Sequence, residues 1–203
     1  MKEFELIRLS QDRKVQGFPK EKNSFGLPVF TTCPGRTKAC EAVCYAKRGT
    51  FTFPAAKKMY QENYGALQTI LLKMPVVEAG AYFAKEIEKH NRGGIFRWNI
   101  SGDVFSTRYW SMMIYIAMIL PKITFWVYTR SFDEIQWAKT CVPENLRVIL
   151  SFDKDNKSRA KNSFVNAVCD DRLISWMGDI KEAKKVFPSR KWFTCPELTK
   201  KIP

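Results

Sequence analysis

Strand-like and helix-like segments alternate through the second half of the chain, and this alternation limits the fold more than any other feature. Strand patterns occupy residues 94–103, 122–131, 145–153, 172–177 and 191–195, and helix patterns occupy 106–120, 132–141, 157–168 and 179–187. Such alternation predicts βαβ units and a parallel sheet. With a further short strand at Phe25–Cys33, we expect an α/β fold with a mostly parallel sheet of five or six strands, either open or closed into an incomplete (β/α) barrel.

Two more helices are predicted ahead of this region. One begins at Pro54, since proline is well tolerated in a first helical turn, and apolar residues then recur at helical spacing. The other runs from about Val76 to His90. No internal repeat, low-complexity tract or linker divides the 203 residues, so we predict a single domain covering residues 1–203.

Polar residues gather where the predicted strands end. In folds with parallel strands, chemistry occurs at the carboxyl ends of the strands. Ser101 and Asp103 follow one strand, Arg130 follows the next, and Cys33 and Cys195 end the first and last. We therefore predict that Ser101, Asp103 and Arg130 line a polar pocket that binds a cofactor or small anionic ligand. An ordinary structural ion pair between the arginine and the aspartate explains the same residues equally well.

Three of the six cysteines fall within the segment 33–49, CPGRTKACEAVCYAKRG, at the spacing C-x6-C-x3-C. Cys40 and Cys44 are four residues apart, so one helical turn places both on the same side. Cys33 approaches from the end of the first predicted strand. The four basic residues of the segment are expected to lower the pKa of the thiols and so favour thiolate.

The clustered cysteines have three competing explanations: an iron–sulfur cluster, a zinc site, or unrelated buried thiols. Zinc sites commonly use two C-x2-C or C-x4-C pairs, whereas this segment has one group and no nearby histidine. Iron–sulfur clusters accept more varied spacings, often with a remote fourth cysteine. A [4Fe–4S] cluster is therefore the favoured cofactor. Cys141 and Cys169 have no cysteine neighbour and are interpreted as buried core thiols.

The remote Cys195, in WFTCPE, is the candidate fourth ligand. If it does not bind, three cysteines leave one iron open, which would point towards catalysis. The N-terminus has charged residues where a secretory signal needs an apolar block, so we predict a cytoplasmic protein without structural disulfides. The longest apolar stretch, WSMMIYIAMIL, stops at Pro121 and is too short for a membrane span.

The formal net charge of +14 makes nucleic acid a candidate partner. The basic residues are spread along the whole chain and form no block of consecutive Lys and Arg, so a solvated, lysine-rich surface is the competing interpretation.

Several motifs, taken in order, resemble the bacteriophage protein family typified by mycobacteriophage gene product 88. They are TTCPGRTKACEAVCYAKRGTFTFPAAKKMYQEN, FRWNISGDVFS, TFWVYTRS and the final TCPE. The resemblance implies a bacteriophage origin, expression in the host cytoplasm, and an iron–sulfur protein with the metal ligands Cys33, Cys40, Cys44 and Cys195. Relatives continue with further cysteines after the CP, whereas this sequence has none after Cys195, so a second metal site is not expected.

Three functions compete on these grounds. The first is a [4Fe–4S] protein with a redox or sensing role and a redox partner protein. The second is an enzyme that is similar to radical S-adenosylmethionine proteins, although their usual C-x3-C-x2-C spacing differs from the one found here. The third is a nucleic-acid-binding module in which the metal is structural.

Overall fold

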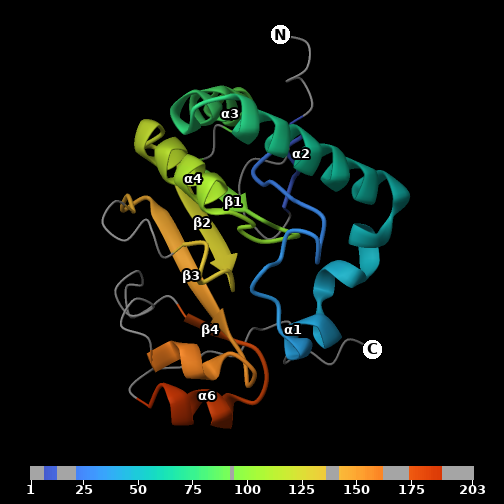
Figure 1. Cartoon of the computed structure of the whole chain (residues 1–203), viewed down its shortest axis with the longest axis vertical. Coiled ribbons are helices and arrows are strands. Elements are labelled where there is room, and N and C mark those ends of the chain that lie inside the picture. The colour runs from blue at the N-terminus through green and yellow to red at the C-terminus, as the bar shows by residue number, and fades with distance from the viewer. Residues whose placement is uncertain (1–6, 13–21, 92–93, 136–141, 162–173, 189–203) are drawn as a thin grey trace.

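A sheet of four parallel strands, in chain order from β1 to β4, organises the fold (Figure 1). The structure is a computed structural model that describes residues 7–12, 22–91, 94–135, 142–161 and 174–188. The strands are β1 (Ile95–Trp98), β2 (Thr124–Thr129), β3 (Leu146–Phe152) and β4 (Ile174–Trp176). The predicted α/β class and parallel sheet are confirmed.

Helices connect and flank the strands. They are α1 (Lys38–Val43), α2 (Pro54–Lys73), α3 (Val76–His90), α4 (Thr107–Ile119) and α6 (Ile180–Val186), with the 3-10 turns η2 (Tyr45–Lys47), η3 (Gly49–Thr52) and η5 (Lys157–Lys161). Two predicted helix starts are confirmed: Pro54 opens α2, and α3 covers Val76–His90. Helix α4 begins where the side chain of Ser106 accepts a hydrogen bond from the backbone N–H of Tyr109.

One face of the sheet forms the core. Alternate residues of the strands point to this face, because side chains along a strand alternate between its two sides. They include Phe96, Trp98, Phe125, Val127, Val148, Leu150 and Phe152, all buried. Helices α3 and α4 cover them through ring contacts of Trp98 with Phe83 and Tyr109, and α6 is joined to them by the contact of Phe187 with Phe152.

The opposite face has a different composition. Arg97, Trp126 and Arg147 are neighbours in register on β1, β2 and β3, and Tyr128 follows on the same side of β2. None of these four is fully buried, and Tyr128 is 40% exposed. In the part of the chain that the structure describes, α3, α4 and α6 all contact the core face, while α1 lies near the ends at which the strands finish (Figure 1).

The sheet has fewer strands than predicted, and two predicted strands account for the difference. Residues Phe25–Cys33 were expected to form one, but only the segment up to Leu27 runs beside β1, through hydrogen bonds such as Phe25 N to Arg97 O at 3.1 Å. Pro28 lacks an N–H group, and Phe30 adopts a left-handed φ of 69°, so the chain turns away. The strand predicted at 191–195 lies outside the described residues.

Two predicted helices also differ from the structure. The predicted helix at 132–141 begins with turns up to residue 135, and the helix at 157–168 begins as the 3-10 turn η5; the remainder of each lies outside the described residues. The four strands described form an open sheet with two different edges, so no barrel closes among them. No helix in the described ranges is both long enough and apolar enough to cross a bilayer.

Candidate functional site

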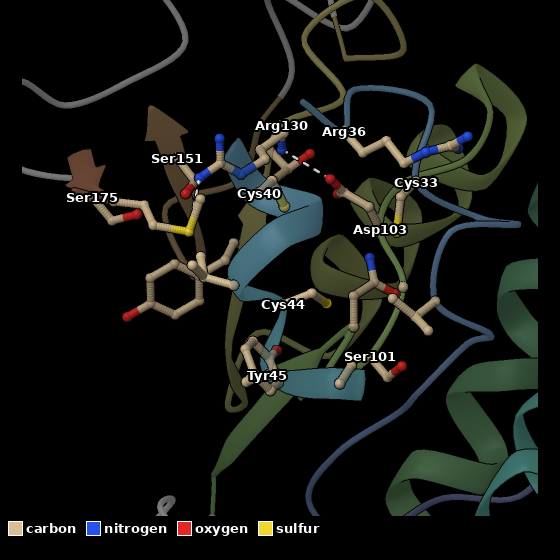
Figure 2. Close-up of a pocket in the computed structure, with 18 of the residues that line it drawn as sticks. Cys33, Arg36, Cys40, Cys44, Tyr45, Ser101, Asp103, Arg130, Ser151 and Ser175 are labelled. Carbon is tan, nitrogen blue, oxygen red and sulfur yellow. Dashed lines mark hydrogen bonds between the residues drawn. The ribbon is translucent and has the colours of Figure 1, made fainter. Parts of the chain in front are cut away.

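A pocket of about 810 Å³ lies at the carboxyl ends of the strands, on the face opposite the core (Figure 2). All six predicted site residues that fall in the described ranges line it: Cys33, Cys40, Cys44, Ser101, Asp103 and Arg130. Cys195, Cys141 and Cys169 lie outside those ranges. The sequence therefore predicted which residues would meet, although they come from three separate parts of the chain.

Cys33 lies in a turn and not at a strand end. Its backbone N–H donates to the carbonyl of Phe30, and its own carbonyl accepts from the N–H of Arg36. The turn lies directly against the end of β2, because a Cβ atom on Gly35 would collide with the carbonyl group of Arg130. Only glycine permits this approach, which brings the first cysteine over the sheet.

Cys40 and Cys44 are held by the short helix α1. Thr37 caps this helix and accepts a hydrogen bond from the N–H of Cys40 at 3.0 Å. The hydroxyl of Thr37 also donates to the Asp153 carboxylate at 2.6 Å. Cys44 follows the last helical residue and lines the same pocket as Cys40, as their spacing predicted. The end of β3 thus fixes the position of the cysteine helix.

Asp153 also binds Arg130, and this pairing corrects one prediction. The guanidinium of Arg130 donates to the Asp153 carboxylate at 2.5 Å, and both side chains are buried. Asp103 was the expected partner, but it accepts from the backbone N–H of Arg130 at 2.9 Å. Asp153 was not among the predicted site residues, although its position at a strand end was the available signal.

Asp103 is a buried carboxylate beneath the cysteines. It accepts hydrogen bonds from the backbone N–H groups of Val104 and Arg130, and burial raises its pKa above the usual aspartate range. The turn that carries it needs Gly102, which has a φ of +77° and lies against Thr32 and Leu27. Ser101, also buried, uses its carbonyl to accept from the N–H of Leu27. The SGD turn therefore supports the start of the cysteine segment.

The thiols are harder to ionise than the sequence predicted. Burial, followed by the charge of Asp103, raises the pKa of Cys33 to about 12. Burial also raises the pKa of Cys40, against the opposing effect of Arg130. For Cys33 and Cys40 the expectation of a lowered pKa is wrong, because the four basic residues that were to lower it, Arg36, Lys38, Lys47 and Arg48, are exposed to solvent. Both thiols are therefore protonated at neutral pH in this state.

The three sulfur atoms face one shared space, with Asp103 and Arg130 beside it (Figure 2). None of the three cysteines is in a disulfide. Within the described residues, no group of three or more His, Cys, Asp or Glu side chains is close enough to hold a single metal ion. A multi-iron cluster makes a different demand, since each thiolate binds its own iron. The donor set matches a cluster in chemistry, and binding would require the thiols to lose their protons.

Sequence analysis missed the aromatic side of the pocket. Trp126 and Tyr128 line it together with Arg97 and Asn99, and none of the four was among the predicted site residues. The signal was present in the period of two along β2, which places Trp126 and Tyr128 on the side opposite Phe125 and Val127. Tyr45, which follows Cys44, also lines the pocket and is exposed.

Comparison with known proteins identifies relatives over nearly the whole chain. The family model described as Gene product 88 matches residues 5–196. The Gene 88 protein of Mycobacterium phage D29 is 27% identical over 210 residues, covering 95% of this chain and 84% of the relative. The Gene 88 protein of Mycobacterium phage L5 is 27% identical over 214 residues, covering 97% and 86%. No solved structure matches. The family predicted from the motifs is confirmed, and the chain belongs to the Gene product 88 family of bacteriophage proteins.

Proposed function

We propose that the protein binds one [4Fe–4S] cluster through Cys33, Cys40 and Cys44 and uses it for electron transfer or sensing in the cytoplasm of the host cell. The observation that supports this most is the convergence of the three thiols. They come from a turn and a short helix, yet all three line one pocket at the carboxyl ends of the strands. Three cysteines in one pocket are the usual minimum for holding a [4Fe–4S] cluster.

The surroundings of the thiols also support the proposal. Thr37 and Asp153 fix the helix that carries Cys40, and Gly35 allows the loop that carries Cys33 to lie on the sheet. Ligands that are positioned by a second set of contacts are typical of metal sites.

Cys195 is proposed as the fourth ligand. Four thiolates leave no vacant iron, so the cluster would exchange electrons with a partner protein and would not bind substrate. Closing a loop of roughly 150 residues is entropically tolerable, because its free-energy cost grows only with the logarithm of its length. The test is Cys195→Ser, followed by electron paramagnetic resonance of the reduced protein and by thermal unfolding.

The second candidate is an enzyme that resembles radical S-adenosylmethionine proteins, with three cysteines and an open iron. The observation that favours it is the size of the pocket, since about 810 Å³ lies within the range of small-molecule sites. An unchanged spectrum and unchanged stability in Cys195→Ser would favour this candidate over electron transfer.

The first experiment is purification without oxygen, followed by absorption spectroscopy. We expect a brown protein with a broad band near about 400 nm, from thiolate-to-iron charge transfer. A colourless protein with stoichiometric zinc would contradict the proposal. Contact with nucleic acid, suggested by the net charge of +14, is not part of this proposal.

A further inference from the structure

The pocket extends well beyond the three cysteines, along the face of the sheet that α3, α4 and α6 leave free. Arg97, Asn99, Trp126 and Tyr128 form this extension on β1 and β2, and Ser151 and Ser175 form it on β3 and β4. We call these six residues the aromatic compartment. Five of them lie on one face of the sheet because they alternate with core-facing residues along their strands, and Asn99 directly follows the end of β1. A cluster bound to the thiols would leave this compartment unused.

Three hydrogen-bond donors in the compartment have no acceptor among the described residues. They are the indole Nε1 of Trp126, the amide Nδ2 of Asn99 and Nε of Arg97. Asn99 is 4% exposed and holds a left-handed φ of 53°, while its Oδ1 accepts from the hydroxyl of Tyr109 at 2.9 Å. That bond orients the amide so that the unpaired group is a donor. Buried donors are mostly paired in native proteins, and these three, unlike the unpaired indole groups of the core residues Trp98 and Trp110, belong to residues that line a pocket, which favours a partner that supplies acceptors.

The ion pairs of two arginines favour a partner that is neutral where it meets the compartment. The guanidinium of Arg97 is paired with Asp12 at 2.5 Å, and that of Arg130 is paired with Asp153. Arg97 and Arg130, which both line the pocket, therefore already have carboxylates. A phosphate or carboxylate would have to displace one of them, whereas a neutral acceptor would complete the unpaired donors directly.

The aromatic side chains add a preference for a planar ring. The rings of Trp126 and Tyr128 lie 6.3 Å apart, and the guanidinium carbon of Arg97 lies 5.7 Å from the centre of the Tyr128 ring. Tryptophan, tyrosine and arginine side chains stack against the ring of any nucleobase, because every base has a flat π face. Ser151 and Ser175 are partners in register on β3 and β4, and they offer hydroxyl groups on the adjoining wall.

From these contacts we propose that the aromatic compartment binds a free nucleoside. A nucleobase is a planar neutral ring with acceptor nitrogens and carbonyls along its edge, which suits the stacking surface and the unpaired donors. The sugar supplies hydroxyl groups for the two serines. The proposal rests on the pocket and does not require the cluster, so each can fail without the other.

The test is isothermal titration calorimetry of the full-length protein, purified without oxygen, with adenosine, guanosine, cytidine and uridine. Ribose is the control ligand. We expect saturable binding of at least one nucleoside and none of ribose. Trp126→Leu, which removes both ring and donor, should weaken binding about tenfold or more. Trp126→Phe, which retains a ring but removes the donor, should weaken it about three- to tenfold.

The matched control is Trp176→Phe. Trp176 lies on β4 in the same sheet and its Nε1 is also unpaired in the described structure, but it packs against the core and does not line the pocket. This variant should bind the nucleoside as the wild-type protein does. Circular dichroism checks that each variant folds. If Trp126→Leu does not fold, Trp126→Phe alone decides the test.

Two results would overturn the proposal. One is the absence of saturable binding by all four nucleosides. The other is wild-type affinity in folded Trp126→Phe and Trp126→Leu. Iron content is measured on the same samples. A protein that binds a nucleoside but no iron refutes only the cluster, and a protein that binds iron but no nucleoside refutes only the nucleoside site.

Discussion

The two faces of the sheet are built from the same strands but serve different purposes. On the core face, Trp98 is fully buried and contacts the rings of Phe25, Phe83, Phe96, Tyr109 and Phe125. On the pocket face, Trp126 and Tyr128 remain partly exposed, and two arginines are held in ion pairs. Stability is therefore concentrated on one side of each strand, and groups able to bind a ligand or metal on the other.

The largest expected effect tests the core face. Trp98→Ala should lower the free energy of unfolding by about 3–5 kcal/mol, because it leaves a cavity among five rings. Tyr128→Ala, on the pocket face, should lower it by less than about 1 kcal/mol, as usual for a substitution of an exposed residue. Urea unfolding followed by circular dichroism measures both. Equal losses would show that the two faces contribute alike.

The ion pair at the end of β3 gives the next effect. Asp153→Ala leaves the buried Arg130 without its carboxylate and Thr37 without its acceptor, so about 3 kcal/mol should be lost. The control is Asp133→Ala, which breaks the exposed pair with Arg159 and should change the free energy of unfolding by at most about 1 kcal/mol. Thermal or urea unfolding compares them, and a small effect of Asp153→Ala would remove this residue as the anchor of the cysteine helix.

A third prediction concerns the glycine that lets the cysteine loop reach the sheet. Gly35→Ala places a Cβ atom against the backbone of Arg130, so the loop must move and iron binding should fall, with a loss of about 1–3 kcal/mol in stability. Gly65→Ala is the matched control, since its Cβ meets nothing and alanine favours the interior of α2 by about 1 kcal/mol. Normal iron content in Gly35→Ala would show that the loop position does not matter.

The smallest effect is a change in thiol reactivity. Asp103→Asn removes a charge that raises the pKa of Cys33, so this pKa should fall below its value of about 12. Burial is the larger cause and remains, so the pKa should stay above that of a free thiol. Alkylation by iodoacetamide, measured against pH in the metal-free protein and assigned by mass spectrometry, reports the change. An unshifted profile would mean that Asp103 and Cys33 do not interact.

The sequence predicted features that depend on local pattern and on topology. Helix α3 was located to the residue, and Ser101, Asp103 and Arg130 were placed in one pocket because parallel strands end together. It could not predict the partner of Arg130, because the choice between Asp103 and Asp153 depends on tertiary packing. The prediction of the pKa values of Cys33 and Cys40 was wrong for a similar reason. Basic residues can be counted in the sequence, but the burial of each thiol cannot be read from it.

The central claim is that the pocket face holds a cluster on Cys33, Cys40 and Cys44, and one series of variants tests it directly. Cys33, Cys40, Cys44, Cys141 and Cys169 are each replaced by serine in turn, and iron and acid-labile sulfide are measured after purification without oxygen. The account predicts about four irons and four sulfides per chain in the wild-type protein and in Cys141→Ser and Cys169→Ser, with loss of both in Cys33→Ser, Cys40→Ser and Cys44→Ser. Full iron content in any of the last three, or a wild-type protein that contains zinc and no sulfide, would contradict it.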